Sequence, residues 1–154
     1  QEHKNLMIYI NKWDLMERTD DVRRQFVKRV KLELPFLENY PIKVGSAKEK
    51  INLAQLFKEI PKVIERGEKR VSTSELNFFI RNIMKKSPPT SKRGTYIKIY
   101  YATQVGIDPP HFIFFINHPN LVQESYKRFL EKQLRDYFGG FNGNTIQINF
   151  KSHR

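Results

Sequence analysis

Hydrophobic and polar positions along the chain change several times from strand-like to helix-like spacing. A short apolar segment at residues 8–10 precedes residues 22–34, where apolar positions recur at helical spacing until Pro35 ends the pattern. A second apolar segment at residues 42–44 precedes a second amphipathic pattern at residues 51–64. Because parallel strands need helical crossovers, this order predicts the back half of a doubly wound parallel α/β sheet.

Apolar positions become rare around residues 66–74, where charged and hydroxyl residues predominate, and we predict a domain boundary at residue 70. Beyond it the pattern predicts a helix, two strands, a helix and a strand, at residues 76–84, 95–105, 111–117, 121–138 and 145–150. The predicted fold is therefore a parallel α/β unit over residues 1–70, followed by an α+β unit of order α-β-β-α-β over residues 71–154.

The first predicted strand ends in Asn-Lys-Trp-Asp, which places polar residues where α/β folds bind their ligands. The Asp14 carboxylate can accept hydrogen bonds from guanine N1–H and N2–H2, a pair of donors that adenine does not offer. The stem of Lys12 can lie along the base, and Asn11 can connect neighbouring loops. Alternatively, the segment is a surface turn in which Asp14 caps the next element.

The second predicted strand ends in Ser-Ala-Lys, and the two motifs together resemble the guanine-specificity loops of translation-factor-type GTPases. The resemblance implies a guanine site formed by Asn11, Lys12, Asp14, Ser46, Ala47 and Lys48. In that site Ala47 would donate its backbone N–H to guanine O6, and Ser46 and Lys48 would shape the loop. Residues 1–70 would then be the carboxyl-terminal part of a P-loop GTPase domain that binds GTP or GDP.

The phosphate-binding part of such a site has no counterpart in the sequence. There is no Gly-x-x-x-x-Gly-Lys-Ser/Thr and no Asp-x-x-Gly switch, so we expect no catalytic residue here and no ligand for the Mg²⁺ of a complete GTPase. The chain also begins at Gln1. We therefore expect a fragment that is inactive as a GTPase by itself.

Composition narrows the possible environments and partners. The absence of cysteine excludes disulfides and thiolate metal sites, and the four histidines lack ligand-like spacing, so no metal site is expected. No apolar run is long enough to span a membrane. The net charge of +12 suits an anionic partner such as RNA, although solubility alone also explains a basic surface.

The second half contains several segments that are similar to the C-terminal KH-like domain of the EngA (Der) family of bacterial double GTPases. These segments are Ser87-Pro88-Pro89 and residues 98–104, 109–112 and 125–131. The resemblance implies a cytoplasmic, monomeric ribosome-assembly factor whose partners are the large ribosomal subunit and ribosomal RNA. The sequence departs from the family at residues 144–146, where a Gly-Thr-Pro is expected, which leaves the geometry of that turn open.

A row of basic residues lies on the polar side of the predicted 121–138 helix. The candidates for contacting RNA phosphates are Lys127, Arg128, Lys132 and Arg135. A merely solvated face is the alternative, because Glu131 and Asp136 can pair with these cations locally. Other basic candidates are the turn at residues 92–93 and the tail at residues 151–154.

The sequence allows two further interpretations, one of a glycine motif and one of the function of the whole chain. The Gly-x-x-Gly at residues 140–143 matches the backbone clamp of many KH domains, but it lies between a helix and a strand and contains no basic residue, so a clamp is disfavoured. The rival function is a stand-alone RNA-binding adaptor with a degenerate GTPase domain, in which the Asn-Lys-Trp-Asp loop is vestigial.

Overall fold

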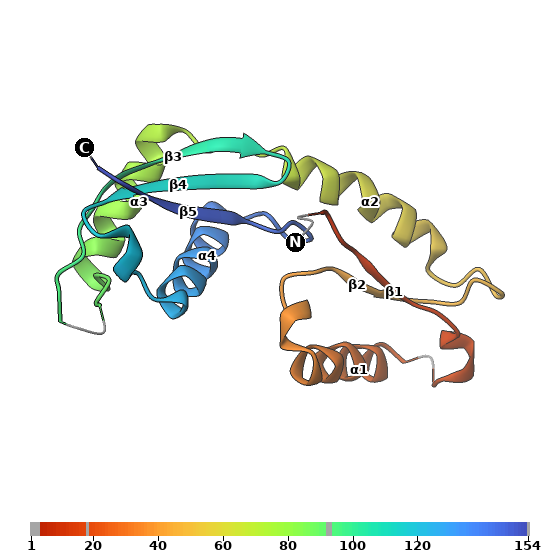
Figure 1. The fold of residues 1–154 in the computed structure, drawn as a ribbon. Helices are drawn as coiled ribbons and strands as arrows, with labels where there is room; N and C mark the ends of the chain where they lie inside the picture. The colour runs from red at the N-terminus through yellow and green to blue at the C-terminus, as the bar shows by residue number, and fades with distance from the viewer. Residues whose placement is uncertain (1–3, 18, 92–93, 154) are drawn as a thin grey trace.

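The computed structural model of the chain describes residues 4–17, 19–91 and 94–153. The described residues form two β-sheets, one in each half of the chain (Figure 1). The first contains β1 (Ile8–Ile10) and β2 (Ile42–Val44), and the second contains β3 (Ile99–Ile107), β4 (Pro110–Ile116) and β5 (Gln147–Ser152). Helices α1 and α2 accompany the first sheet, and helices α3 and α4 accompany the second.

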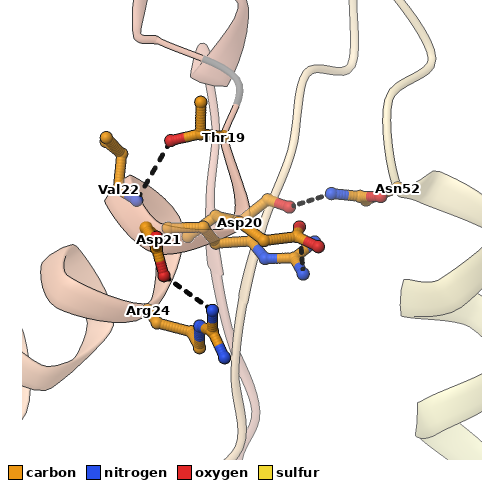
Figure 2. Close-up of polar contacts among 8 residues, drawn as sticks. Thr19, Asp20, Asp21, Val22, Arg24 and Asn52 are labelled. Atoms are coloured by element: carbon orange, nitrogen blue, oxygen red, sulfur yellow. Dashed lines mark hydrogen bonds and ion pairs between the residues drawn. The ribbon is translucent and has the colours of Figure 1, made fainter.

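The first sheet is parallel, as the strand-helix-strand pattern predicts, with Ile8 opposite Ile42 and Ile10 opposite Val44. Helix α1 (Asp20–Glu33) makes the crossover. It begins where the Thr19 side-chain oxygen accepts a hydrogen bond from the Val22 N–H at 3.3 Å, and an Asp21–Arg24 ion pair lies in its first turn (Figure 2). Acidic side chains at this end also interact favourably with the helix dipole.

Helix α2 (Leu53–Gly67) is held to β2 by a cluster of three charged side chains. Lys43 Nζ lies 3.5 Å and Arg66 Nη1 lies 3.0 Å from the carboxylate of Glu59, whose side chain is only 14% exposed. Burial tends to raise the pKa of the Glu59 carboxyl, but the hydrogen bond from Arg66 and the charges of both cations outweigh it and lower that pKa. The ionised carboxylate therefore helps to hold α2 against the strand.

The second half has the predicted order α-β-β-α-β. Helix α3 (Thr73–Lys86) begins at a serine N-cap, in which Ser72 Oγ accepts the Glu75 N–H at 3.2 Å and donates to the Glu75 carboxylate at 2.7 Å. Strand β3 pairs antiparallel with β4, and β4 pairs parallel with β5. The parallel pairing is possible because α4 (Glu124–Phe138) forms the crossover between β4 and β5.

Three predicted boundaries in this half are wrong. Strand β3 begins at residue 99 and not at 95; the Thr95 N–H instead donates a 2.8 Å hydrogen bond to Ser91 Oγ. The long helix begins at Glu124 and not at 121, because a 3₁₀ turn, η3 (Pro119–Leu121), precedes it. The last strand begins at Gln147 and not at 145, since residues 141–145 form a turn against the first half.

The large hydrophobic core lies entirely in the second half. It joins the inner face of the three-stranded sheet to α3 and α4, and its fully buried members include Leu76, Ala102, Phe112, Phe114, Leu130 and Leu134. In the first half, by contrast, the buried hydrophobic residues are Trp13, Leu37, Val44 and Val63. Helix α1 contains no buried residue among those described, so its apolar stripe is only partly covered.

The two halves meet at the turn formed by residues 141–145. The Gly143 N–H donates to Asn39 O at 2.8 Å, and the Leu6 N–H donates to Gly143 O at 2.7 Å. Asn144, which is fully buried, donates from its side-chain amide to Val63 O at 3.0 Å. Gly143 has a φ of +89°, and a Cβ on it would lie 2.7 Å from Val63 Cγ1. A glycine is therefore required at this contact.

Residues 66–74, where the domain boundary is predicted, are also held by specific contacts. Gly67, the last residue of α2, is buried, and its Cα faces the side chains of Asn5 and Asn144. The Gln104 side chain accepts the Val71 N–H at 2.7 Å and donates to Lys69 O at 3.0 Å. The buried Gln104 side chain on β3 therefore satisfies two backbone groups of this connection and holds it to the second sheet.

Candidate functional site

The structure brings the Asn-Lys-Trp-Asp and Ser-Ala-Lys loops together. Because β1 and β2 are parallel neighbours, their carboxyl ends lie at the same edge of the sheet. The Ala47 backbone N–H donates a 2.9 Å hydrogen bond to Asn11 Oδ1, although the two residues are 36 positions apart in sequence. Asn11 thus connects neighbouring loops.

The first loop is held in shape around a buried tryptophan. Trp13 is 4% exposed, its backbone N–H donates to Gly45 O at 3.0 Å, and its ring meets the Phe26 ring edge-on at 5.4 Å. Lys12 precedes it in the left-handed conformation, with a φ of +63°, and its side chain is exposed. Asp14 follows in the 3₁₀ turn η1 (Trp13–Leu15) and is partly buried. The lysine and the aspartate are therefore positioned on either side of a fixed residue.

The second loop is closed by a pair of backbone hydrogen bonds between Ser46 and Ile51, at 3.1 and 2.9 Å. Ser46 is 1% exposed, and its hydroxyl oxygen accepts the Glu49 N–H at 3.1 Å. The side chain of Lys48 extends into solvent and is 83% exposed. This arrangement leaves the backbone of Ala47 at the outer end of the loop, beside Asn11.

The Ala47 N–H is the group that links the two loops. The Ala47 N–H, expected to donate to guanine O6, donates to Asn11 Oδ1 in this structure. A guanine O6 bound there would have to replace Asn11 as the acceptor or share the N–H with it. The hydrogen bond from Ala47 to Asn11 therefore helps to hold the two loops together.

The basic candidates on α4 differ in how far their side chains are exposed. Arg128 and Lys132 are exposed and Lys127 is half-buried, as a surface role requires. Arg135 comes two helical turns after Arg128, on the same side of α4, but it is only 7% exposed and so does not present its charge to solvent as expected. The predicted basic positions 92, 93 and 154 lie outside the described residues.

Arg135 instead organises the turn that joins the halves. Its guanidinium donates to Phe141 O at 2.5 Å and to Asn144 O at 2.9 Å, and it pairs with Glu131 at 2.7 Å. Phe141 is the first residue of this turn; its φ is +64°, and its side chain is fully buried. Sequence reasoning missed this role; the only signal was the glycine-rich segment at 139–143, which marks a turn that needs unusual backbone angles.

Two other features are absent from the described residues. No group of three or more histidine, cysteine or acidic side chains among them is placed to hold a metal ion. None of the helices in the described ranges has both the length and the apolar character needed to cross a membrane.

Comparison with known proteins identifies the second half directly. Residues 70–151 match the family model described as KH-domain-like of EngA bacterial GTPase enzymes, C-terminal. Over 148 residues, or 96% of this chain, it is 41% identical to GTPase Der of Natranaerobius thermophilus and 40% identical to GTPase Der of Staphylococcus carnosus. It is also 38% identical to GTPase Der of Chloroherpeton thalassium over 98% of this chain.

The matched region covers 33% of the first relative and 34% of the other two, so the chain spans about a third of the length of these curated relatives. The similarity extends through both halves, because nearly the whole chain aligns with each relative. The family model itself covers more than half of the residues and includes the two helices and all of the three-stranded sheet except the last residue of β5. The chain therefore belongs to the EngA (Der) family of bacterial GTPases and carries the KH-like domain of its C-terminus.

Proposed function

We propose that residues 1–70 are the carboxyl-terminal part of a P-loop GTPase domain and form the base-recognition half of a GTP/GDP site. The 2.9 Å hydrogen bond from the Ala47 N–H to Asn11 Oδ1 carries this proposal, because it joins the two loops at one edge of a parallel sheet. Asp14 would accept from guanine N1–H and N2–H2, and the stem of Lys12 would lie against the base. Ser46 and Lys48 would support the second loop.

The phosphate half of the site is proposed to come from outside residues 1–154. The sequence contains neither a P-loop nor an Asp-x-x-Gly switch, so its own residues do not bind the β- and γ-phosphates or Mg²⁺. The relatives named GTPase Der are about three times as long as the aligned region, which leaves ample length for those elements. Residues 1–154 alone should consequently hydrolyse no GTP.

We further propose that the KH-like half, residues 71–154, faces RNA in ribosome assembly. The partners would be ribosomal RNA and the large ribosomal subunit, met in the cytoplasm by a monomeric protein. The net charge of +12 and the exposed Arg128 and Lys132 on α4 support an anionic partner. The alternative, an RNA-binding adaptor with a vestigial guanine loop, shares this partner but predicts no nucleotide binding.

The guanine assignment is tested by changing Asp14 to Asn in the longest natural protein that contains this chain. Asparagine has one acceptor oxygen where aspartate has two, so its amide N–H2 faces one of the guanine donors, which should cost roughly 1–3 kcal/mol of GDP binding. Xanthosine diphosphate, which offers an acceptor opposite the new amide donor, should bind the variant more tightly than GDP. Both affinities are measured by competition with a fluorescent nucleotide.

The matched control is Asp136→Asn, the same chemical change at an exposed position of α4 far along the chain from both loops. It should leave both affinities at their wild-type values. Wild-type nucleotide preference in the Asp14→Asn protein would reject the guanine site, and no nucleotide binding by the unaltered protein would favour the adaptor.

A further inference from the structure

The outer face of the three-stranded sheet is distinct from both candidate sites. Cross-strand register places Tyr101 opposite Phe115, and Phe115 opposite Lys151. The neighbouring row contains Thr103, Ile113 and Asn149. The alternate residues of β4, Phe112 and Phe114, point to the other face and are fully buried in the core with α3 and α4. One face of this sheet is thus used for the core, and the other carries aromatic and polar side chains.

Aromatic rings gather at one end of this outer face. The Tyr101 and Phe115 rings are stacked, with centroids 4.4 Å apart and planes 15° from parallel. The His153 ring lies edge-on to Tyr101 at 5.7 Å and next to Tyr100 at 4.4 Å. Both tyrosines are exposed, Tyr100 at 43% and Tyr101 at 38%. We call these four residues the sheet patch.

Two cations flank the sheet patch. Lys98 Nζ lies 5.2 Å from the centre of the Tyr100 ring, and the exposed Lys151 is the cross-strand neighbour of Phe115. Strands β3, β4 and β5 contain no aspartate or glutamate at all. The acidic residue nearest in sequence, Asp108, lies beyond the opposite end of β3 and accepts a hydrogen bond from Asn5 at 3.3 Å. The local charge is therefore positive.

A purely structural role explains only part of this arrangement. Stacked cross-strand aromatic pairs stabilise a sheet by roughly 0.2–1 kcal/mol, which accounts for the Tyr101–Phe115 contact. It does not account for the exposure of two adjacent tyrosines, for the lysines beside them or for the absence of acids. Those three features suit a ligand that offers both flat rings and negative charge.

Single-stranded RNA has both properties. Its unpaired bases stack on exposed aromatic side chains with little sequence preference, and β-sheet faces serve as such platforms in several RNA-binding folds. Its phosphates interact with lysines a few ångströms away from the rings. Double-stranded RNA does not fit, because its bases are already stacked and paired. An apolar protein partner would gain nothing from the flanking lysines.

We propose that the sheet patch binds single-stranded RNA, with bases stacked on Tyr101 and Phe115 and phosphates beside Lys98 and Lys151. This inference rests on the proposed RNA-facing role of the KH-like half and assigns it a surface other than α4. Binding on an open sheet face also makes the Gly-x-x-Gly segment unnecessary as a backbone clamp.

The test uses residues 1–154 and a fluorescein-labelled twelve-nucleotide uridine RNA, with affinity measured by anisotropy at several salt concentrations. Tyr101→Ala should weaken binding roughly five- to hundredfold, the range found for loss of one stacked base. Tyr101→Phe should bind within about twofold of wild type, since the ring remains. Lys98→Gln and Lys151→Gln should each lower the slope of log affinity against log salt by roughly 0.7.

The matched control is Phe78→Ala on α3. Phe78 is 52% exposed and has the Arg81 guanidinium 5.9 Å from its ring, so it is an aromatic residue beside a cation that lies outside the sheet. Its removal should not change RNA affinity. Photocrosslinking of the unaltered chain with 5-iodouridine RNA supplies a readout that does not depend on how the variants fold. The crosslinked peptides should contain Tyr101 or Phe115.

The outcomes separate this inference from the function on which it rests. Wild-type affinity in Tyr101→Ala, together with crosslinks on α4, would reject the sheet patch and leave an RNA-facing KH-like half in place. Failure of the unaltered chain to bind the RNA would reject both. The guanine test with Asp14→Asn is unaffected by either result.

Discussion

At the scale of single residues, the most informative side chain is Arg135. Four basic residues recur along α4, yet only this one is buried, where it binds the carbonyl oxygens of Phe141 and Asn144. Burying a guanidinium is costly unless an opposite charge compensates it, and the Glu131 carboxylate supplies that charge at 2.7 Å. Arg135 thus stabilises the turn that contacts the first half.

Replacing Arg135 with Gln should destabilise the protein by roughly 2–3 kcal/mol, because two buried carbonyl oxygens lose their charged donor. Arg128→Gln, two turns earlier on the same helix but at a solvent-exposed position, should change stability by no more than about 0.5 kcal/mol. Urea unfolding of both variants measures the difference. Equal stability of the two proteins would mean that the Arg135 contacts add nothing to folding.

At the scale of elements, α4 presents an apolar side to the core and a cationic side to solvent. Its apolar side supplies Leu130 and Leu134 to the core, and Tyr126 near its start donates from its hydroxyl to Ser87 O at 3.1 Å. Burial raises the pKa of that tyrosine, so it remains a neutral donor. The opposite side presents Arg128 and Lys132 to solvent. A packed helix can carry a cationic surface because its position does not depend on those charges.

If this surface contacts ribosomal RNA phosphates, the double change Arg128→Gln and Lys132→Gln should lower the salt slope of binding by roughly 0.7–0.9 per residue. Stability should change by only about 0.5 kcal/mol, since glutamine is a good helix former. Binding of the longest natural protein to purified large ribosomal subunits, measured at several salt concentrations, provides the slope.

The matched control for α4 is Lys85→Gln with Lys86→Gln, which removes two exposed cations from the last turn of α3. A loss of slope confined to the α4 variant supports a phosphate contact there. An unchanged slope would show that α4 is only solvated, and an equal loss in both variants would show that any surface cation has the same effect.

At the scale of the whole molecule, the two halves differ greatly in how much they bury. The first half leaves Leu32, Leu34 and Phe36 exposed, and a groove of about 730 Å³ opens between α1, β2 and the start of α2. The Asn52 side chain donates to Val44 O at 3.0 Å at the margin of this groove (Figure 2). A two-stranded sheet with so little core depends for its stability on the turn at residues 141–145.

We therefore expect residues 1–70 of the isolated chain to unfold locally while residues 72–154 remain folded. Hydrogen exchange should be fastest in β1, β2 and α1 and slowest in β4, and limited proteolysis should cut first within residues 1–70. A protease-resistant fragment with residues 5–65 but without the KH-like half would contradict this expectation.

The sequence by itself determined the elements and the motifs. Helical and strand-like spacing depends on neighbours a few positions apart, so the order of strands and helices and the polar residues after β1 and β2 could be read directly. The resemblance to the EngA family was likewise carried by short segments, such as Ser87-Pro88-Pro89, and comparison with known proteins confirms it. The exact ends of the strands and helices could not be read in this way, because the contact of Thr95 with Ser91 and the turn at Pro119 lie outside the regular pattern.

Only the tertiary structure decided what those residues contact. Charged side chains are usually exposed, so nothing in the sequence near Arg135 indicates that it is buried while Arg128 is not. The difference arises because the turn at residues 141–145 folds over Arg135. The Ala47–Asn11 hydrogen bond and the Tyr101–Phe115 stack likewise require strand pairing, which brings distant residues within bonding distance. Such contacts depend on register and packing across the whole chain, and these are set by long-range burial that short-range spacing does not encode.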